Sequence, residues 1–479
     1  MENKLEKKYG LLTAIAMVVG IVIGSGVFFK GQNVLNATGG DLVQGILAWV
    51  IGGIIMVICA ITFSGFAMKF QKVNGLVDYA EATCGKGFAY YLSWFMITIY
   101  YPGMTSVLAW VSARYTLVLF IGDDSMLTSG LCMALGCFYL CAVFAMNALA
   151  PKIAGKFQVS TTVIKLIPLA LVVLVGVTTG LFNGNTVEAF KNTVANDMQN
   201  SSGLFAAIIA TVFAYEGWIV ATSINAELKN AKRTLPLALL IGSLIIIGIY
   251  VLYFIGLASA APVGELMEKG AVVGFKNLFG NVGATIINAF VVFSCLGTLN
   301  GLTVGCSRGM YAMAARRQGP RPDVMGEISP STNMTGNSAW VGLLVCGAWY
   351  FYFYGANLTA SIFGLFTFDS SEIPIVTIYA FYIPIFVMFM VRHGKENIFR
   401  NIVMPALATI ASGFMIFAAV YAHGVAPYKT AKAAGEFAFP ILFYMIVFAV
   451  VMGVGVLFYK KGNAAVEEAP AEESVSVEE

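Results

Sequence analysis

The chain has 479 residues, of which 59% are hydrophobic and 11% charged, with a mean hydropathy of +0.82 and a net charge of +3. A soluble globular domain carries about 25% charged residues, so the composition excludes a water-soluble protein and, outside short tails, a disordered one. The small net charge also argues against a nucleic-acid partner. We therefore expect an all-α integral membrane protein in a lipid bilayer.

Twelve apolar runs follow one another along the chain, and most have about the length that crosses a bilayer as a helix. Residues 1–10 form a charged N-terminus that lacks the cleavage site of a signal peptide. Residues 460–479 are acidic and lack a periodic apolar face, which predicts a disordered tail. The runs lie approximately at 11–36, 42–68, 88–120, 127–150, 157–182, 203–226, 236–260, 281–314, 339–356, 359–391, 402–423 and 438–459.

The basic residues are unevenly distributed over the predicted loops. With the N-terminus inside, 20 Lys and Arg residues face the cytoplasm and 7, Lys30 among them, face outward, while Lys165 remains within the fifth run. Cytoplasmic loops of membrane proteins carry such an excess of Lys and Arg. The pattern predicts a multi-pass protein of the cell membrane with both termini in the cytoplasm.

The first and sixth runs contain residues that do not suit a lipid-facing helix. The first reads GIVIGSGVFF, with Gly24, Ser25 and Gly26 near mid-span, and the sixth reads FAYEGW, with Glu216 and Gly217. Close helix packing explains one glycine-rich span but not a second one five helices later. Interrupted spans at matching places in two inverted halves indicate a secondary transporter with its binding site at the membrane midplane. An unwound turn exposes amides that suit a carboxylate and carbonyls that suit an ammonium, so an α-amino acid is the first ligand suggested.

Lys165 lies within the fifth run, between STTVI and LIPLA. A lysine at this depth costs about 3 kcal/mol or more, and it is too far from either end of the span to snorkel easily. We expect it to face the bundle and to donate to carbonyls freed by the break in the first span. The alternative is a purely structural lysine.

Four motifs resemble the amino acid–polyamine–organocation superfamily, and specifically a bacterial member of its L-amino acid transporter branch. They cover roughly residues 5–400 in the right order: GIVIGSGVFF, VSTTVIKLIPLALVV, FAYEGW with NAELKNAKRTLPLA, and SCLGTLNGLTVGCSRGMYAMAARRQGPRP. The resemblance implies a transporter domain over 11–459 with the leucine-transporter-like fold. In that fold helices 1 and 6 of twelve transmembrane helices are broken. Two inverted five-helix repeats, about 11–182 and 203–391, are followed by two extra helices, 402–423 and 438–459.

The resemblance also implies roles for single residues. A glycine–serine segment holds the substrate carboxylate with its amides and hydroxyl, while carbonyls of spans 1 and 6 accept from the substrate ammonium, and the Phe213 ring acts as a gate. The ammonium of Lys165 occupies the place that sodium takes in sodium-driven relatives. The substrate-binding positions implied in this way are Val22, Gly24, Ser25, Gly26, Phe213, Ala214 and Glu216.

Three carboxylates depart from the family pattern. Glu216 stands where relatives often carry small residues, and it could attract a cationic side chain or bind a proton. Asp369 and Glu372, in FTFDSSEIP of the tenth run, are three residues apart and hence expected on one helical face, which Pro374 should disturb. They either line the substrate path or pair with polar groups such as Arg308 or hydroxyls elsewhere in the bundle.

These observations favour a sodium-independent carrier of amino acids, most naturally neutral L-amino acids, that works by alternating access with exchange or proton coupling. The alternative within transport is a carrier of cationic amino acids or polyamines, and a channel or sensor is the alternative from another class. Eight cysteines without a CxxC motif and two histidines predict neither a metal site nor a cofactor, and no nucleophile–base pair indicates an enzyme. The outer loop IGDDSM lacks the cysteine with which relatives bind a heavy subunit, so no disulfide-linked partner is expected.

Overall fold

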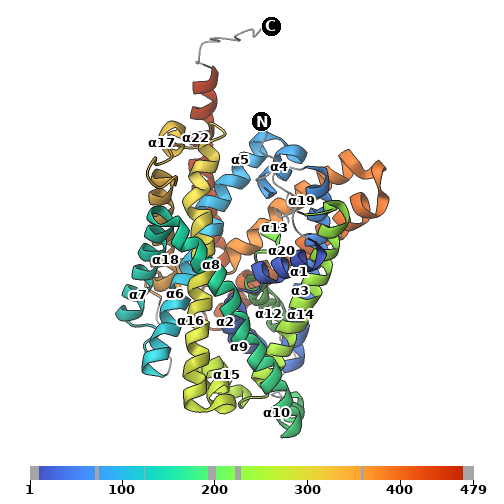
Figure 1. The fold of residues 1–479 in the computed structure, drawn as a ribbon, viewed down its shortest axis with the longest axis vertical. Helices are drawn as coiled ribbons and strands as arrows, with labels where there is room; N and C mark the ends of the chain where they lie inside the picture. Colours follow the sequence, from blue (N-terminus) through green and yellow to red (C-terminus); the bar gives the residue numbers. More distant parts are fainter. Residues whose placement is uncertain are drawn as a thin grey trace.

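A computed structural model describes the chain over residues 10–70, 75–122, 125–191, 201–221, 228–357 and 361–467. These residues fold into helices and contain no strand, as expected from the composition. Figure 1 shows a bundle with helix α22 (Pro440–Glu467) extending from one end and helices α10 (Val177–Phe182) and α15 (Val263–Lys269) at the other end, here called the α15 side. The predicted N-terminus, 1–10, lies outside the described residues except for Gly10.

The first predicted span is broken, as the sequence indicated. Helix α1 (Leu11–Val22) and helix α2 (Gly26–Ala37) meet at an angle of 55°. Helix α3 (Leu42–Lys69) begins where the Asp41 carboxylate accepts a hydrogen bond from the Gln44 amide at 3.0 Å. The third span is assembled from α4 (Leu76–Cys84), α5 (Lys86–Phe95), a π-helical turn η1 (Met96–Tyr100) and α6 (Tyr101–Ile121).

The fourth and fifth spans follow with short connections. The Ser129 hydroxyl caps α7 (Gly130–Leu149) by accepting from the Cys132 amide at 3.2 Å. Lys165 separates the first two helices of the fifth span, and a short helix follows the span on the α15 side. These elements are α8 (Pro151–Ile164), α9 (Leu166–Leu171), η2 (Val172–Gly176), α10 (Val177–Phe182) and α11 (Asn185–Lys191).

The sixth span is also broken, because α12 (Ser201–Tyr215) ends before α13 (Trp218–Ala221) begins. Residues 222–227, the end of the predicted span, lie outside the described residues. The helices that follow are α14 (Ala231–Ala258), α15 (Val263–Lys269), α16 (Ala271–Ala314), α17 (Pro322–Met325), α18 (Gly336–Asn357) and α19 (Ile373–His393). Helix α16 is kinked at Gly280, where φ is 68°.

The tenth span differs from the prediction at its start. Helix α19 begins at Ile373, whereas residues 361–372 form turns, extended backbone and the short 3-10 helix η4 (Gly364–Phe366). The expectation that Asp369 and Glu372 share a helical face is therefore wrong. Pro374 is the second residue of the helix, where its fixed φ is tolerated, rather than a disturbance within it.

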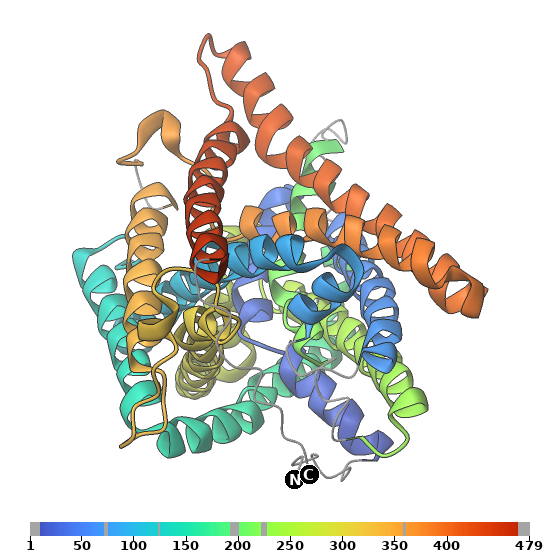
Figure 2. The ribbon, with the colours of Figure 1, turned by 90° about the horizontal axis from the view of Figure 1, so that it is seen from above.

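The last two spans run along one edge of the bundle (Figure 2). They comprise η5 (Gly394–Glu396), η6 (Phe399–Val403), α20 (Met404–Val420), η7 (Tyr421–Val425), α21 (Ala426–Ala433) and α22 (Pro440–Glu467). Helix α22 extends beyond residue 460, where the sequence predicted a disordered tail to begin. The rest of that tail, 468–479, lies outside the described residues.

The described residues include ten helical segments that are long and apolar enough to cross a membrane, or eleven if α1 and α2 count as one bent span. The apolar helix in the sixth position, Gly203–Tyr215, is shorter. The chain is thus a multi-pass helical membrane protein. The exact number of twelve spans and the inverted repeat remain predictions.

The spans pack into two groups of helices. One group contains α1, α2, α3, α12 and α14, and the other contains α6, α7, α8, α16 and α18. The groups meet closely where α14 crosses η2, since a Cβ atom added to Gly176 would lie 2.6 Å from the Gly256 carbonyl oxygen. Backbones can approach this closely at small residues, a common feature of membrane helices.

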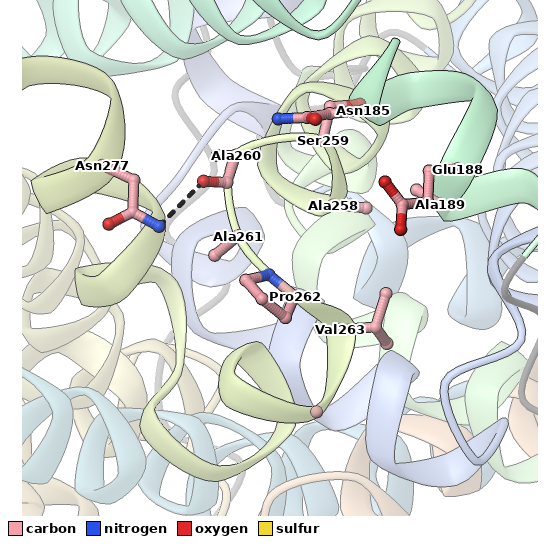
Figure 3. A pocket seen from close by; sticks show the side chains of 11 residues that line it. Asn185, Glu188, Ala189, Ala258, Ser259, Ala260, Ala261, Pro262, Val263 and Asn277 are labelled. Carbon is pink, nitrogen blue, oxygen red and sulfur yellow. Dashed lines mark hydrogen bonds between the residues drawn. The ribbon is translucent and has the colours of Figure 1, made fainter. Parts of the chain in front are cut away.

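A cavity of about 360 Å³ opens on the α15 side, between α11, the end of α14 and α15. Figure 3 shows Asn185, Glu188 and Ser259 on its wall, and Asn277, whose side-chain amide donates to the Ala260 carbonyl at 3.0 Å. Its lining includes none of the predicted substrate-binding residues. We therefore turn to the broken helices rather than to this cavity for the functional site.

Candidate functional site

The break in the first span leaves carbonyl oxygens of α1 without partners inside their own helix. The Ile23 amide closes the helix by donating to the Val19 carbonyl at 2.9 Å, so the carbonyls that follow project beyond its end. Two of them are taken by side chains from other spans: Lys165 Nζ donates to the Gly20 carbonyl at 2.7 Å, and the Tyr250 hydroxyl lies 3.4 Å from the Val22 carbonyl. The carbonyl oxygens at this end of α1 are acceptors of the kind to which a substrate ammonium could bind.

The N-terminus of α2 lies on the other side of the break and presents donors. Ser25 precedes the helix, and its amide donates to the Thr298 hydroxyl of α16 at 3.4 Å. Ser25 is fully buried, and its own hydroxyl has no hydrogen-bond partner among the described residues. A buried hydroxyl without a partner at a helix N-terminus is suited to a carboxylate, because the helix dipole and the free amides favour an anion there.

The sixth span breaks next to the first one. Gly217 has a φ of 108°, which a residue with a side chain rarely adopts, and this conformation turns the chain between α12 and α13. A Cβ atom added to Gly26 would lie 2.7 Å from Ala214 Cα, so the start of α2 packs directly on the backbone of α12. The structure thus brings Gly26 and Ala214, which the sequence implied for one pocket, into contact.

Tyr250 of α14 connects the two breaks. Its hydroxyl lies 2.9 Å from the Ala214 carbonyl and 3.4 Å from the Val22 carbonyl, and its side chain is fully buried. The sequence gave no sign of this role, because Tyr250 is one of 21 tyrosines in the chain and stands in an ordinary apolar run. The tyrosine hydroxyl therefore holds together the two carbonyl-bearing helix ends of the site.

Replacing Tyr250 by Phe should lower the initial rate of amino acid exchange by up to about tenfold, because it removes the hydrogen bond whose single hydroxyl proton is directed at the Ala214 and Val22 carbonyls, worth about 0.5–1.5 kcal/mol. Tyr253→Phe is the matched control. Tyr253 lies on the same helix and is equally buried, but its hydroxyl has no hydrogen-bond partner among the described residues. The initial rate of amino acid exchange in proteoliposomes is measured for both variants. Equal rates in the two variants would show that the Tyr250 hydroxyl does not support the site.

Glu216 lies within the break of the sixth span. Its carboxylate accepts a hydrogen bond from the Tyr100 hydroxyl, and Tyr100 is the last residue of the π-helical turn η1. Such turns are frequent at functional sites, because they redirect a side chain out of the regular helix.

Phe213, the predicted gate, is buried on the α15 side of the break. Its ring packs edge-on against Phe29, with ring centroids 5.3 Å apart. The ammonium of Lys30 lies 5.2 Å from the centre of the Phe213 ring. Lys30 was counted among the basic residues of the outer side, and its side chain is 1% exposed, so it points into the protein rather than into the aqueous phase.

Asp369 and Glu372 lie in the turn that precedes α19. Asp369 Oδ1 accepts from the amides of Ser371 and Glu372 at 2.6 and 3.0 Å, so it stabilises the turn. Glu372 forms an ion pair with Lys30, with Oε1 and Nζ 2.5 Å apart. The expectation that these acids pair with polar groups of the bundle holds for Glu372, but its partner is Lys30 rather than Arg308.

Comparison with known proteins identifies the family. A sequence model described as "Amino acid permease" matches residues 9–452. The chain belongs to the amino acid permease family, within the amino acid–polyamine–organocation superfamily. The resemblance deduced from the four motifs is thereby confirmed.

The permease is similar to several characterised transporters. It is 30% identical to the serine/threonine exchanger SteT of Bacillus subtilis over 428 residues, which are 87% of the permease and 91% of SteT. It is 24% identical to the human b(0,+)-type amino acid transporter 1 over 445 residues, 87% and 83% of the two chains. The human cystine/glutamate transporter is 27% identical over 329 residues, 68% of the permease and 64% of that protein. Amino acid transport is the function that these relatives share by name.

Proposed function

We propose that the permease is a sodium-independent carrier of neutral L-amino acids that works by alternating access, with exchange as its basic mode. The observation that carries this proposal is the contact between the two broken spans. At this contact the partnerless hydroxyl of Ser25 and the start of α2 lie next to the carbonyls of Val22 and Ala214. Donors for a carboxylate and acceptors for an ammonium within one buried site fit the α-amino and α-carboxyl groups of an amino acid.

The absence of a sodium requirement is argued from Lys165. Its ammonium is bound to the Gly20 carbonyl at the end of α1, in the place the family resemblance gives to sodium in sodium-driven relatives. A fixed positive charge there repels a second cation at close range. We propose that the permease lies in the cell membrane with both of its termini in the cytoplasm, because the excess of basic residues in the predicted cytoplasmic loops favours this orientation.

A carrier of cationic amino acids or polyamines is the second candidate, and Glu216 supports it. Of the three carboxylates that favoured it in the sequence, Asp369 is bound to amides and Glu372 to Lys30. Glu216, bonded to a neutral tyrosine hydroxyl, is the one that a cationic side chain could still approach. A carboxylate so placed would distinguish substrates by the charge of their side chains.

A counterflow screen tests the proposed function. Liposomes that contain the purified permease are loaded with one of the twenty L-amino acids at a time, and the entry of labelled L-serine is measured. Serine is chosen as the label because the relative SteT is named for serine and threonine. We expect counterflow with small neutral amino acids, and little with amino acid amides or decarboxylated analogues. Equal competition by amines would favour the polyamine carrier, and flux without counterflow would favour a channel.

Glu216→Gln should weaken uptake of cationic substrates more than that of neutral ones, by about 1–3 kcal/mol, the value of a buried charge-assisted hydrogen bond. Glu268→Gln, on the exposed face of α15, is the control. Competition of lysine and of serine against labelled serine measures the difference. A variant with the wild-type ratio of the two affinities would exclude a role of this carboxylate in substrate selection.

A further inference from the structure

Three ionisable side chains from three different spans meet on the α15 side of the site. Lys30 comes from α2, Glu372 from the turn before α19, and His423 from η7. The side chains of Lys30 and Glu372 are 1% and 7% exposed, and their charged atoms are 2.5 Å apart. His423 Nε2 lies 3.4 Å from Glu372 Oε2 and has no hydrogen-bond partner among the described residues.

Lys30 connects this cluster to the substrate site. Its ammonium donates to the Ser371 hydroxyl at 3.3 Å, and that hydroxyl donates to Asp369 Oδ1 at 2.6 Å. The same ammonium lies 5.2 Å from the centre of the Phe213 ring. Lys30 is also four residues from Gly26, on the helix whose N-terminus faces the proposed carboxylate site. A movement of α2 that admits substrate therefore also moves Lys30.

The ion pair joins α2 to a turn that contacts α6. Helix α2 packs on α12 in the first group. The turn before α19 packs on α6 of the second group, since a Cβ atom added to Gly103 would lie 3.4 Å from the Ser370 carbonyl oxygen. Carriers of this type open by rocking one group against the other around a fixed site. An opening on the α15 side that moves α2 relative to α6 would therefore separate Lys30 from Glu372.

The charge balance of the cluster changes when Lys30 leaves. With the ion pair closed, the two carboxylates of Asp369 and Glu372 face one ammonium. Without Lys30 the buried Glu372 carboxylate would lose its ion-pair partner beside the half-buried Asp369, and an uncompensated buried charge is strongly unfavourable. A proton taken from the aqueous phase on the α15 side restores the balance, and His423 is the side-chain type that gains a proton between pH 5 and 8.

We propose that Glu372 and His423 form a proton-binding site that is filled when Lys30 separates from Glu372, so that opening of the permease on the α15 side is linked to the uptake of a proton. The link to transport rests on the proposed carrier function, whereas the proton site itself does not. The proton is shared by the carboxylate and the imidazole, which titrate as a pair.

The other ionisable groups near the pair can be named. The electrostatic partners of His423 are Glu372, Asp369 and Lys30. Two neighbouring elements add Tyr444 of α22, whose hydroxyl is bonded to Thr377, and Lys429 of α21, whose ammonium lies over the ring of Tyr421. Neither of these two residues lies on α2, so Lys30 is the charge that makes proton binding depend on the position of α2.

The transport test measures serine exchange in proteoliposomes with the same pH on both sides. Wild-type exchange should be about three times faster, or more, at pH 5.5 than at pH 8, because proton uptake favours the open state and histidine titrates in this range. His423→Gln should flatten this profile. His393→Gln, at the other histidine, should keep it. The link to transport would be overturned if the wild-type rate did not depend on pH or if His423→Gln kept the wild-type pH dependence. It would also be overturned if Glu216→Gln, rather than His423→Gln, abolished that dependence.

A second measurement tests the proton site without transport. In His393→Gln protein labelled with ¹⁵N-histidine, His423 gives the one histidine signal, and its titration is followed by NMR. Adding Lys30→Met should raise the midpoint of that titration by about one pH unit or more, because a neighbouring positive charge is removed. A midpoint that stays the same or falls would refute the proton site, even in a protein that exchanges serine normally. Absence of exchange in the wild-type permease, together with the expected NMR shift, would instead refute the proposed carrier function and leave the proton site standing.

Discussion

Gly26→Leu is expected to abolish amino acid exchange while the protein remains folded. The structure strengthens the reason, because a Cβ atom at this position would already lie 2.7 Å from Ala214 Cα and 3.3 Å from the Ala214 backbone nitrogen. Even Gly26→Ala should therefore push α2 away from α12 and impair exchange. A larger side chain adds bulk where the two broken spans must meet around the substrate.

Gly248→Leu is the matched control for this prediction. Gly248 is an exposed glycine within α14, and a Cβ atom added there would have no neighbour within 4 Å. Counterflow of labelled serine gives the activity, and size-exclusion chromatography of the purified variants gives the folded fraction. Near-normal exchange in Gly26→Leu would mean that the contact between the two breaks is not the substrate site.

Lys165→Ala should slow exchange by about 10- to 100-fold, because a buried hydrogen bond from a charged group is worth about 1.5–3 kcal/mol and its loss leaves the Gly20 carbonyl without this partner. Lys156→Ala is the control, since Lys156 lies on α8 one helix earlier and is exposed. Exchange by the unmodified permease should also be equal in sodium and in choline buffer. A strict requirement for sodium, or wild-type exchange in Lys165→Ala, would contradict the assigned role.

The two breaks could be predicted because their causes are local. Gly24, Ser25 and Gly26 weaken the helix exactly where they stand in the chain, and Glu216 with Gly217 does the same in the sixth span. The buried lysine was equally visible, because Lys165 is costly anywhere in the middle of an apolar run. Sequence alone therefore indicated that the first span would break near Gly24 to Gly26 and that a lysine would meet the carbonyls freed there.

The partners of these breaks could not be predicted, because contacts between distant residues leave no local pattern. Tyr250 reaches Val22 across 228 positions, and Lys30 reaches Glu372 across 342. From the sequence alone, many other residues of the apolar runs could equally well be the partners of Val22 and Lys30. The identity of each partner depends on how the helices cross, which the residue pattern of one span does not specify.

The start of the tenth helix could have been predicted better. An aspartate that accepts from the amides two and three residues later competes with helix formation, and a proline at the second position of a helix marks its beginning. The segment Asp369 to Pro374 carries both signals. The apolar residues before it, FGLFTF, made the span look continuous, although they belong to turns and extended backbone.

The glycine crossing between α14 and η2 has a mechanical consequence. At Gly176 and Gly256 the two backbones touch without side chains that interlock, since a Cβ atom at Gly256 would lie 2.7 Å from the Val172 carbonyl oxygen. Interlocked side chains resist rotation of one helix over another, whereas two smooth surfaces in contact resist separation but allow rotation. A contact of this kind between α14 and η2 is suited to a pivot, since no side chain at the two glycines blocks a change of the angle between the helices.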